Sequence, residues 1–571
     1  MEKSFYNNGR FCILLISHCV LLMSSGLCSN PFSYDRYSEK ECVTEPPKSS
    51  SNIGGLILNR DVEDDAGNRK LHGNGAISEI VHRVHVHQGH IYTFSAWVRT
   101  GKGESTRVEA SFRTEDGGLI HGGEVAAGKA CWSLLKGGIV ANFSGPVDLL
   151  FKSQNRGAEI SVAEMSLQRF TKRQWKLEQD QVIDKIRKSR VRFQVTYRNK
   201  TAVKGATISV NRIKPSFLLG CGMNYRILSS QGYRNWFASR FKLTSFTNEM
   251  KWYTTEKVRG RENYTLADSM LKFAEENGIK VRGHTVLWDN PKMQPSWVQN
   301  VTGAEDLMNV TLNRINSVMT RYKGKLTGWD VMNENVHFRF FEDMLGENAS
   351  ASFYSLASKL DPDITLFVNE YNTLENSKEG IASPVNVKKK MEEIVAFPGN
   401  MNMRGGIGAQ GHFGPYQPNL AYIRSALDTL GSLGFPVWLT EVDIPKCPDQ
   451  VKYLEEILRE AYSHPAVEGI IMFAGPEVSG FDKLTLADKD FKNTETGDLV
   501  DRLLKEWQPS ETQEFEITSD GGLGFSQEVS LLHGDYRATV NHHHPPWMKS
   551  LSTSLSFEVK KEEMVQVVID A

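Results

Sequence analysis

The chain has 571 residues, of which 40% are hydrophobic and 24% are charged, as is ordinary for a soluble globular protein. That length exceeds what one hydrophobic core usually serves, so roughly two to four domains are expected. The formal net charge is −1, from 67 basic and 68 acidic residues, which argues against nucleic acid or another polyanion as a partner. A neutral polymer is compatible with this balance.

The N-terminus has the pattern of a secretory signal peptide over residues 1–28. Lys3 and Arg10 precede an apolar run, Phe11–Met23, and the small residues Ser24–Gly26 follow it. An uncleaved anchor or a chance apolar stretch is the alternative, but the run is short and interrupted for a membrane span, and the C-terminus has no lipid-anchor tail. We therefore expect a secreted, extracellular protein without a membrane partner.

Sequons and cysteines also bear on export. The six candidate glycosylation sites are Asn142, Asn199, Asn263, Asn300, Asn309 and Asn348. The seven cysteines form no Cys-X-X-Cys pair, so the sequence indicates no metal site and no redox motif. In an exported protein, Cys42 and Cys131 are the first candidates for a disulfide, and buried free thiols are the alternative.

Residues 53–170 follow a Pro- and Ser-rich linker and have the pattern of a β-sandwich. The segment Ile91–Val98 alternates and is rich in aromatic and β-branched residues, and Gly-rich breaks such as Asp116–Gly118 separate further runs. The charged stretch Thr171–Arg192 that comes next predicts a helix or a linker.

From residue 215 to residue 507, short apolar runs alternate with amphipathic segments. The eight strand candidates are Phe217–Asn224, Leu243–Asn248, Lys280–Trp288, Leu326–Glu334, Ile364–Asn372, Gly406–His412, Val437–Val442 and Val467–Ala474. The helical patterns between them include Leu266–Asn277, Leu307–Tyr322, Leu420–Leu433 and Tyr453–Tyr462. Eight repeats of this kind predict the α/β class and a (β/α)8 TIM barrel.

The segments that flank the barrel, residues 171–214 and 509–571, contain further β patterns. Val191–Tyr197 and Ala206–Val210 alternate before the barrel, and the C-terminal extension alternates after it, with Gly534-Asp535 as a predicted turn. We hypothesise that the two flanks pair into one small β-sandwich. Two independent β-extensions are the alternative.

Most of the barrel strand candidates end in polar residues, where this fold carries its active site. Glycoside hydrolysis needs two carboxylates, and Glu334 on the fourth strand and Glu441 on the seventh would face each other over the barrel mouth. Asn333 is suited to bind a sugar 2-hydroxyl. His412 could orient Glu441, and Asp443 could hold the His412 ring.

Five ordered segments resemble glycoside hydrolase family 10, the endo-β-1,4-xylanases. They are Trp329–Glu334 and Leu439–Asp443, which are similar to the two catalytic signatures, and Asn248–Trp252, Arg282–Trp288 and Gly408–His412. The resemblance implies that Glu334 is the acid/base and Glu441 the nucleophile, with Asn333, His412 and Asp443 in support. It also implies a set of sugar-binding residues, namely Asn248, Lys251, His284, Trp288, Tyr371 and Gln410.

Residues 53–170 resemble a family 22 carbohydrate-binding module. The segments that carry this resemblance are Tyr92–Trp97, Cys131–Gly138 and Ser166–Phe170. The whole arrangement is similar to plant cell-wall xylanases, which implies a cell-wall location. Four positions depart from the residues that are usual in the family, namely Thr247 for Glu, Asp289 for His, Glu370 for Asp and Phe473 for Trp.

Two functions are open at this point. The first is hydrolysis of β-1,4-bonds inside xylan or xylo-oligosaccharides by a retaining double displacement, in a monomer and without a cofactor, with transglycosylation as a variant. The second is a non-catalytic xylan-binding wall protein or an inhibitor on the same barrel. The presence of both Glu334 and Glu441 favours the enzyme.

Overall fold

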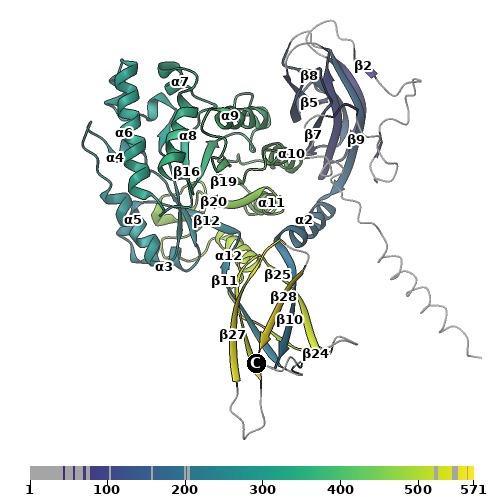
Figure 1. Cartoon of the computed structure of the whole chain (residues 1–571). Coiled ribbons are helices and arrows are strands. Elements are labelled where there is room, and N and C mark those ends of the chain that lie inside the picture. Colours follow the sequence, from purple (N-terminus) through teal and green to yellow (C-terminus); the bar gives the residue numbers. More distant parts are fainter. Residues whose placement is uncertain are drawn as a thin grey trace, which may run out of the picture.

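The structure is a computed structural model that describes residues 43–45, 56–57, 69–71, 78–101, 105–155, 159–197, 201, 203, 206–519, 525–542, 551–561 and 564–570. In this part of the chain, two β-sandwiches are attached to a central barrel (Figure 1). The predicted signal peptide over residues 1–28 lies outside the described residues, and so does the candidate glycosylation site Asn199.

The central barrel contains a strand in each of the eight regions predicted from the alternation. These strands are β12 (Leu218–Met223), β13 (Leu243–Phe246), β14 (Lys280–Gly283), β16 (Gly328–Asn333), β17 (Thr365–Glu370), β18 (Gly405–Ala409), β19 (Val437–Val442) and β20 (Val467–Met472). They are parallel in the order β14-β13-β12-β20-β19-β18-β17-β16, and the pairing of β14 with β16 closes the barrel. The predicted TIM barrel is therefore confirmed. The third predicted strand is divided, since its end forms a separate strand, β15 (Leu287–Trp288).

Helices surround the barrel and bury one face against it. The longer ones are α3 (Gln231–Ala238), α5 (Thr265–Glu276), α6 (Ala304–Tyr322), α8 (Ala349–Leu360), α9 (Pro384–Ala396), α10 (Leu420–Gly431), α11 (Gln450–Tyr462) and α12 (Glu495–Trp507). In α12, Leu499, Leu503 and Trp507 recur at every fourth position and are at most 2% exposed. This spacing keeps one apolar stripe of the helix on the barrel. None of the described helices combines the length and the hydropathy that a membrane crossing requires.

The N-terminal module is a β-sandwich of two antiparallel sheets. Its longer strands are β3 (Ser78–Val86), β4 (His90–Thr100), β5 (Thr106–Thr114), β6 (Leu119–Ala127), β7 (Ser133–Val140), β8 (Gly145–Ser153) and β9 (Ile160–Thr171). One sheet has the order β9-β4-β7 at its centre and the other β3-β8-β5-β6. Phe94 and Phe112 meet edge to face in the core between the sheets.

A disulfide and a β-bridge secure the module near its linker. Cys131 is disulfide-bonded, whereas Cys42, its predicted partner, lies outside the described residues. Val43 forms an antiparallel bridge with Trp132, the residue that follows Cys131. The remaining cysteines of the described barrel, Cys221 and Cys447, are free thiols.

The two flanks of the barrel pair with each other, so the hypothesis of one split β-sandwich is confirmed. The N-terminal flank supplies β10 (Lys188–Thr196) and β11 (Thr207–Pro215), and the C-terminal flank supplies β23 (Gln513–Glu516), β24 (Thr518–Ser519), β25 (Phe525–Leu532), β26 (Gly534–His542), β27 (Leu551–Val559) and β28 (Met564–Asp570). Strand β10 lies between β25 and β28, and β11 lies between β23 and β26.

One detail of the flanks differs from the sequence-based expectation. The predicted turn at Gly534-Asp535 is wrong, because both residues lie in β26, where they pair with β11 and β27. The chain changes sheets one residue earlier, at His533. The charged stretch after the module is a helix, α2 (Lys172–Arg187), which Thr171 caps and which runs directly into β10.

Candidate active site

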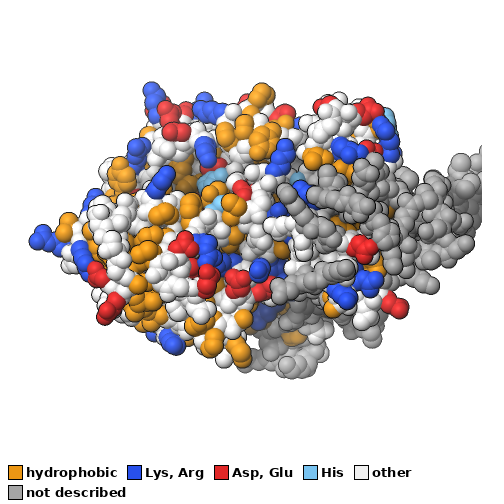
Figure 2. Space-filling model, turned by 90° about the horizontal axis from the view of Figure 1, so that it is seen from above, with side chains coloured by type: hydrophobic (Ala, Val, Ile, Leu, Met, Phe, Trp, Pro, Cys, Tyr) orange, Lys and Arg blue, Asp and Glu red, His pale blue; other side chains and the backbone are white. Residues whose placement is uncertain are grey.

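The predicted site residues come together at the carboxyl ends of the barrel strands. The open face of the molecule seen from above shows histidine side chains among hydrophobic and charged ones over the barrel (Figure 2). Glu334, Gln410 and Glu441 follow or end β16, β18 and β19, and each is less than a tenth exposed. Carboxylates at such low exposure need hydrogen-bond partners or opposite charges.

Glu334 is held by neutral groups. Its Oε2 accepts from the Trp288 indole at 2.7 Å and its Oε1 from the Gln410 amide at 3.2 Å. Its backbone N–H donates to Asn369 O at 2.9 Å. The φ angle of Glu334 is +59°, a left-handed conformation that costs roughly 1–2 kcal/mol for a residue with a side chain. The surrounding hydrogen bonds thus fix the carboxyl group where β16 ends.

Two histidines lie beside Glu441. Its Oε1 lies 4.0 Å from His284 Nε2, and its Oε2 lies 3.5 Å from His412 Nε2. Burial by itself would raise the pKa of the Glu441 carboxyl, but the charges of His284, His412 and Lys251 hold that pKa well below its usual range. Glu441 is therefore ionised across the pH range in which proteins work.

Each histidine beside Glu441 is oriented by an aspartate on its other ring nitrogen. His412 Nδ1 lies 2.9 Å from Asp443 Oδ2, and His284 Nδ1 lies 2.9 Å from Asp330 Oδ2. Burial lowers the pKa of His412, but Asp443 and Glu441 outweigh it and raise that pKa to about 10. His412 is thus a cation at neutral pH, and the predicted link from Asp443 through His412 to Glu441 is present in the structure.

An amide joins the two halves of the site. Asn369, at the end of β17, donates through Nδ2 both to Asn333 Oδ1 at 2.9 Å and to Glu441 Oε1 at 3.0 Å. Its Oδ1 accepts from Thr440 at 2.6 Å, and a Cβ atom at Gly408 would come within 2.4 Å of that oxygen. A glycine at position 408 therefore leaves the space that the Asn369 amide needs.

Polar and aromatic groups line one side of the site. Lys251 Nζ donates to Asn248 Oδ1 at 3.3 Å and lies 4.4 Å from the centre of the Trp288 ring. Asn248 Oδ1 also accepts from the Tyr253 hydroxyl at 2.7 Å. Asn248 is exposed, whereas Lys251 is buried, so the asparagine forms the rim of the site and the lysine its floor.

Tyr371 stands on the opposite side, stacked on His337. The two rings are 3.8 Å apart and nearly parallel, at 6°. His337 Nδ1 lies 2.7 Å from Glu370 Oε2, and the backbone N–H of Val336 donates to the other oxygen of Glu370 at 2.6 Å. Glu370 is therefore a buried support for the Tyr371 platform. Since Glu370 is 0% exposed, a bound sugar does not reach it.

Two of the four positions that depart from the family's usual residues, Asp289 and Phe473, have different surroundings. Asp289 is 0% exposed, and its Oδ1 accepts from the backbone N–H of Phe341, at the start of α7 (Phe340–Leu345), so it faces away from the open site. Burial, with Glu342 nearby, raises the pKa of Asp289 to about 7. Phe473 packs edge to face on His412 and on Phe481 and thus still contributes an aromatic wall.

Three further residues contribute to the site and were not among the predicted ones, namely Asn369, Asp330 and Glu375. Asn369 and Asp330 were visible as polar residues in or after apolar runs, but their roles follow only from their contacts. Glu375, in the loop after β17, accepts from the backbone N–H groups of His412 at 3.1 Å and Asn372 at 2.8 Å. In the part of the chain that the structure describes, no group of three or more His, Cys, Asp and Glu side chains could hold a metal ion.

The candidate glycosylation sites lie on the surface where they are described. The exposed ones are Asn142, Asn263, Asn300, Asn309 and Asn348. Asn300 Nδ2, the atom that would be modified, donates to Ser296 O at 3.0 Å, whereas Asn263 uses its Oδ1 to accept from Thr265 N. Exposure is what an attached glycan requires.

Comparisons with known proteins agree with this geometry. The model of glycosyl hydrolase family 10 matches residues 210–475. Two Arabidopsis thaliana proteins, named endo-1,4-beta-xylanase 5-like and endo-1,4-beta-xylanase 5, are 64% and 65% identical to this chain, over 99% of each chain. The crystal structure of xylanase 10B from Thermotoga petrophila RKU-1 in complex with xylobiose is similar over 51% of this chain and 94% of that one, with a TM-score of 0.45 and 26% identity. The chain belongs to glycosyl hydrolase family 10, together with these endo-1,4-beta-xylanases.

Proposed function

We propose that the chain hydrolyses β-1,4-xylosidic bonds inside xylan and xylo-oligosaccharides with retention of configuration. In this proposal Glu441 is the nucleophile and Glu334 the acid/base. The observation that carries it is the difference between the two glutamates, since Glu441 faces two histidines and a lysine whereas Glu334 accepts from a neutral indole and a neutral amide. A nucleophile must be ionised, and an acid must be able to hold a proton.

The reaction follows from these environments in two steps. Glu334 gives its proton to the glycosidic oxygen while a Glu441 oxygen attacks the anomeric carbon, so the leaving sugar departs as an alcohol. The glycosyl group is then bonded to Glu441. In the second step Glu334 takes a proton from a water, which attacks the same carbon and releases Glu441 as a carboxylate. Two inversions at one carbon give net retention.

The neighbouring residues have separate roles in this proposal. Asn333 lies next to Glu334 and is fixed by Asn369, so its amide can bind a sugar 2-hydroxyl at a constant distance from Glu441. His412 and His284 balance the charge of Glu441 before attack. Trp288, Lys251, Asn248 and Tyr371 supply ring faces and hydrogen-bond donors for sugars on both sides of the cleft. When a sugar hydroxyl replaces water in the second step, the product is a transglycosylated chain.

Export to the cell wall is part of the proposal. It is supported by the N-terminal pattern of residues 1–28 and by the exposure of the five described sequons. Treatment of the protein from a plant culture medium with an amidase that removes N-glycans would lower its apparent mass. An intracellular protein of unchanged mass would contradict this part.

Replacement of each glutamate by glutamine tests the proposed roles. Glu334→Gln and Glu441→Gln should each lower kcat on linear xylan by several orders of magnitude with the thermal unfolding temperature unchanged. The matched control is Glu305→Gln, which changes an exposed glutamate in the first turn of α6, a helix on the outside of the barrel. Proton NMR of the first product should show the β-anomer. An α-anomer would rule out retention.

An external nucleophile separates the two roles. With an aryl β-xylobioside and azide, Glu441→Ala should give the α-azide, because azide attacks from the face that the carboxylate leaves open. Glu334→Ala should give the β-azide, because azide then attacks the glycosyl-enzyme. The opposite assignment of products would exchange the roles of the two residues. Binding of xylan by a wild-type chain without turnover would favour a non-catalytic wall protein instead.

A further inference from the structure

The N-terminal module is seated on the outer helices of the barrel, close to the loop that carries Tyr371. Figure 1 shows it beside α9 and α10, the two helices that follow β17 and β18. At one contact Lys136 Nζ lies 3.0 Å from Asp428 Oδ2, and both side chains are less than a tenth exposed. At another, Asn419 Nδ2 donates to Gly138 O at 3.1 Å. A Cβ atom at Gly138 would come within 2.7 Å of Ala421, so the two bodies are in close contact.

A second contact patch reaches the loop itself. Arg107 of β5 donates through Nη1 to Gly380 O at 2.9 Å, and Glu124 of β6 accepts from the backbone N–H of Val385 at 3.3 Å. Val385 is the second residue of α9, so a carboxylate from the module caps a helix of the barrel. Arg107 and Glu124 also approach each other, at 3.6 Å.

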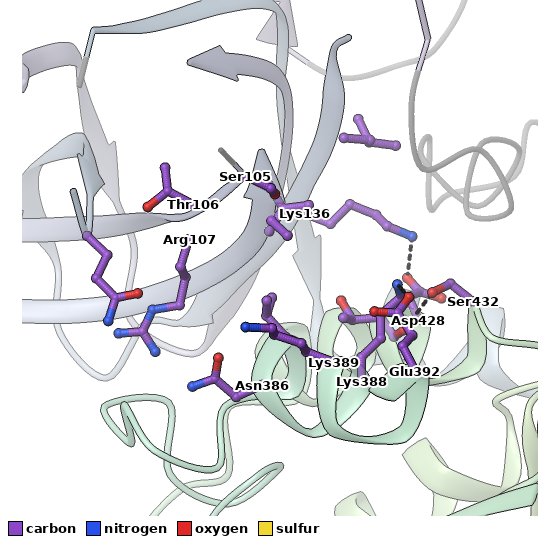
Figure 3. A pocket seen from close by; sticks show the side chains of 16 residues that line it. Ser105, Thr106, Arg107, Lys136, Asn386, Lys388, Lys389, Glu392, Asp428 and Ser432 are labelled. Atoms are coloured by element: carbon purple, nitrogen blue, oxygen red, sulfur yellow. Dashed lines mark hydrogen bonds and ion pairs between the residues drawn. The ribbon is translucent and has the colours of Figure 1, made fainter. Parts of the chain in front are cut away.

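A cavity of about 420 Å³ separates the two patches. Figure 3 shows Arg107 on one side of it, pointing toward Asn386, and the Lys136–Asp428 pair on the other. Besides these two patches, His121 of β6 packs edge to face on Tyr422 of α10. Removal of Arg107 affects the patch at the loop and leaves the Lys136–Asp428 pair in place.

The same loop reaches the active site at its other end. It runs from Tyr371 to Ser383, between β17 and α9. Within it, Glu379 Oε2 accepts from the Asn372 amide at 3.1 Å and lies 3.9 Å from His337 Nε2, the ring under Tyr371. Glu379 is the residue before Gly380, the acceptor of the Arg107 hydrogen bond. One short segment thus links the module to the Tyr371 platform.

The geometry points to Arg107 and Glu124 as positioning residues for the loop from Tyr371 to Ser383, so that the module is a fixed part of the substrate cleft. This inference rests on the proposed function, since it takes Tyr371 as a sugar-binding platform. Arg107 acts at a distance and does not contact substrate. Glu334 and Glu441 are carried at the ends of β16 and β19, and Asn369 of β17 donates to Glu441. The loop meets their surroundings through Glu375, which accepts from the backbone N–H of His412.

The first test is a kinetic comparison in the full chain. Arg107→Ala should raise KM for xylohexaose about three- to tenfold, the range of an ordinary net hydrogen bond, since the lost contact acts on the substrate only through the loop, and leave kcat unchanged. The matched control is Arg83→Ala, which removes an arginine of the same module that is 62% exposed and pairs with Glu115. Arg107→Lys keeps the charge and should restore part of the affinity.

A double variant shows whether Arg107 acts through Tyr371. In a Tyr371→Ala background, Arg107→Ala should raise KM no further, because the platform that it positions is gone. Equal penalties in both backgrounds, or a fall in kcat with KM unchanged, would overturn the inference. If Arg107→Ala does not fold, Arg107→Lys and Glu124→Gln allow the same comparison.

Hydrogen exchange gives a readout that needs no activity. The backbone N–H groups of Asn372, Leu374, Ile381 and Val385 donate to carboxylates of the loop or of the module. Arg107→Ala should speed their exchange at least threefold while the amides of α12 keep their wild-type rate. Unchanged exchange in the loop would overturn the inference even in an active enzyme. A wild-type chain without turnover would instead count against the proposed function.

Discussion

The two β-sandwiches are joined to the barrel in different ways. The N-terminal module is one continuous stretch of chain with its own core, and its contacts with the barrel are mainly side-chain contacts on α9 and α10. The split sandwich takes strands from both flanks, and β10 and β11 are held between strands that lie more than 300 residues away in the chain. The module can therefore unfold by itself, whereas the split sandwich holds the two ends of the barrel together.

The two sandwiches lie at opposite ends of the barrel strands, and only one of them can support the active site. The split sandwich lies at the end of the barrel opposite the carboxyl ends of the strands, since β11 leads directly into the start of β12 (Figure 1). The split sandwich joins the two flanks of the barrel and does not reach the site. The module lies beside the βα loops, so its side chains can support one of them.

The greatest loss of stability is expected from substitutions in the cores of the two sandwiches. Phe112 of the module and Phe193 of the split sandwich are both 0% exposed, so replacement of either by alanine should cost about 3–5 kcal/mol. Calorimetry should show that Phe193→Ala lowers the melting temperature of the barrel, whereas Phe112→Ala lowers the melting temperature of a separate transition of the module. If Phe112→Ala shifts the barrel transition as much as Phe193→Ala does, the module is as tightly coupled as the split sandwich.

A smaller effect is expected from the ion pairs that the two regions use. Lys136→Met leaves Asp428 buried without its lysine and should destabilise the docked module by about 3 kcal/mol. The control, Arg192→Ala, breaks a pair on the split sandwich in which Arg192 is 41% and Glu528 38% exposed, and should cost less than about 1 kcal/mol. Urea unfolding measures both. Similar costs for the two variants would mean that the docking pair is screened by water.

The smallest expected effect is a dependence of docking on pH. Burial lowers the pKa of His121, which packs edge to face on Tyr422 of α10, to about 4. Below its ordinary pKa of about 6.5, the unfolded chain takes up a proton that the folded module does not, so stability falls as the pH falls toward 4. The loss from this group between pH 7 and pH 5 should be about 2 kcal/mol.

Other charged groups surround His121, so the test needs a variant. Glu109, Glu124 and Arg107 all face the ring region, and burial raises the pKa of Glu124, which acts in the opposite direction. The difference between wild type and His121→Gln in urea unfolding at pH 5 and pH 7 isolates the contribution of the histidine. An identical pH dependence in both proteins would contradict the assignment.

Much of the barrel could be predicted because its signals are local. Alternation of apolar runs with amphipathic segments depends on which residues face the core, and neighbours in the chain carry that information. The same holds for the site, since Glu334, Gln410 and Glu441 lie where apolar runs end and the fold presents strand ends at one mouth. The sequence by itself therefore determined the fold of the barrel and which side chains gather over it.

Tertiary structure alone decided the relations between distant segments. The amide of Asn369 joins Asn333 to Glu441, Asp289 turns to Phe341 and away from the cleft, and Arg107 reaches Gly380 of the barrel. Each of these contacts joins residues separated by 36 to 273 positions. Periodicity indicates which face of a segment is buried, but the partner that covers it depends on how whole surfaces fit, and no local pattern records that fit.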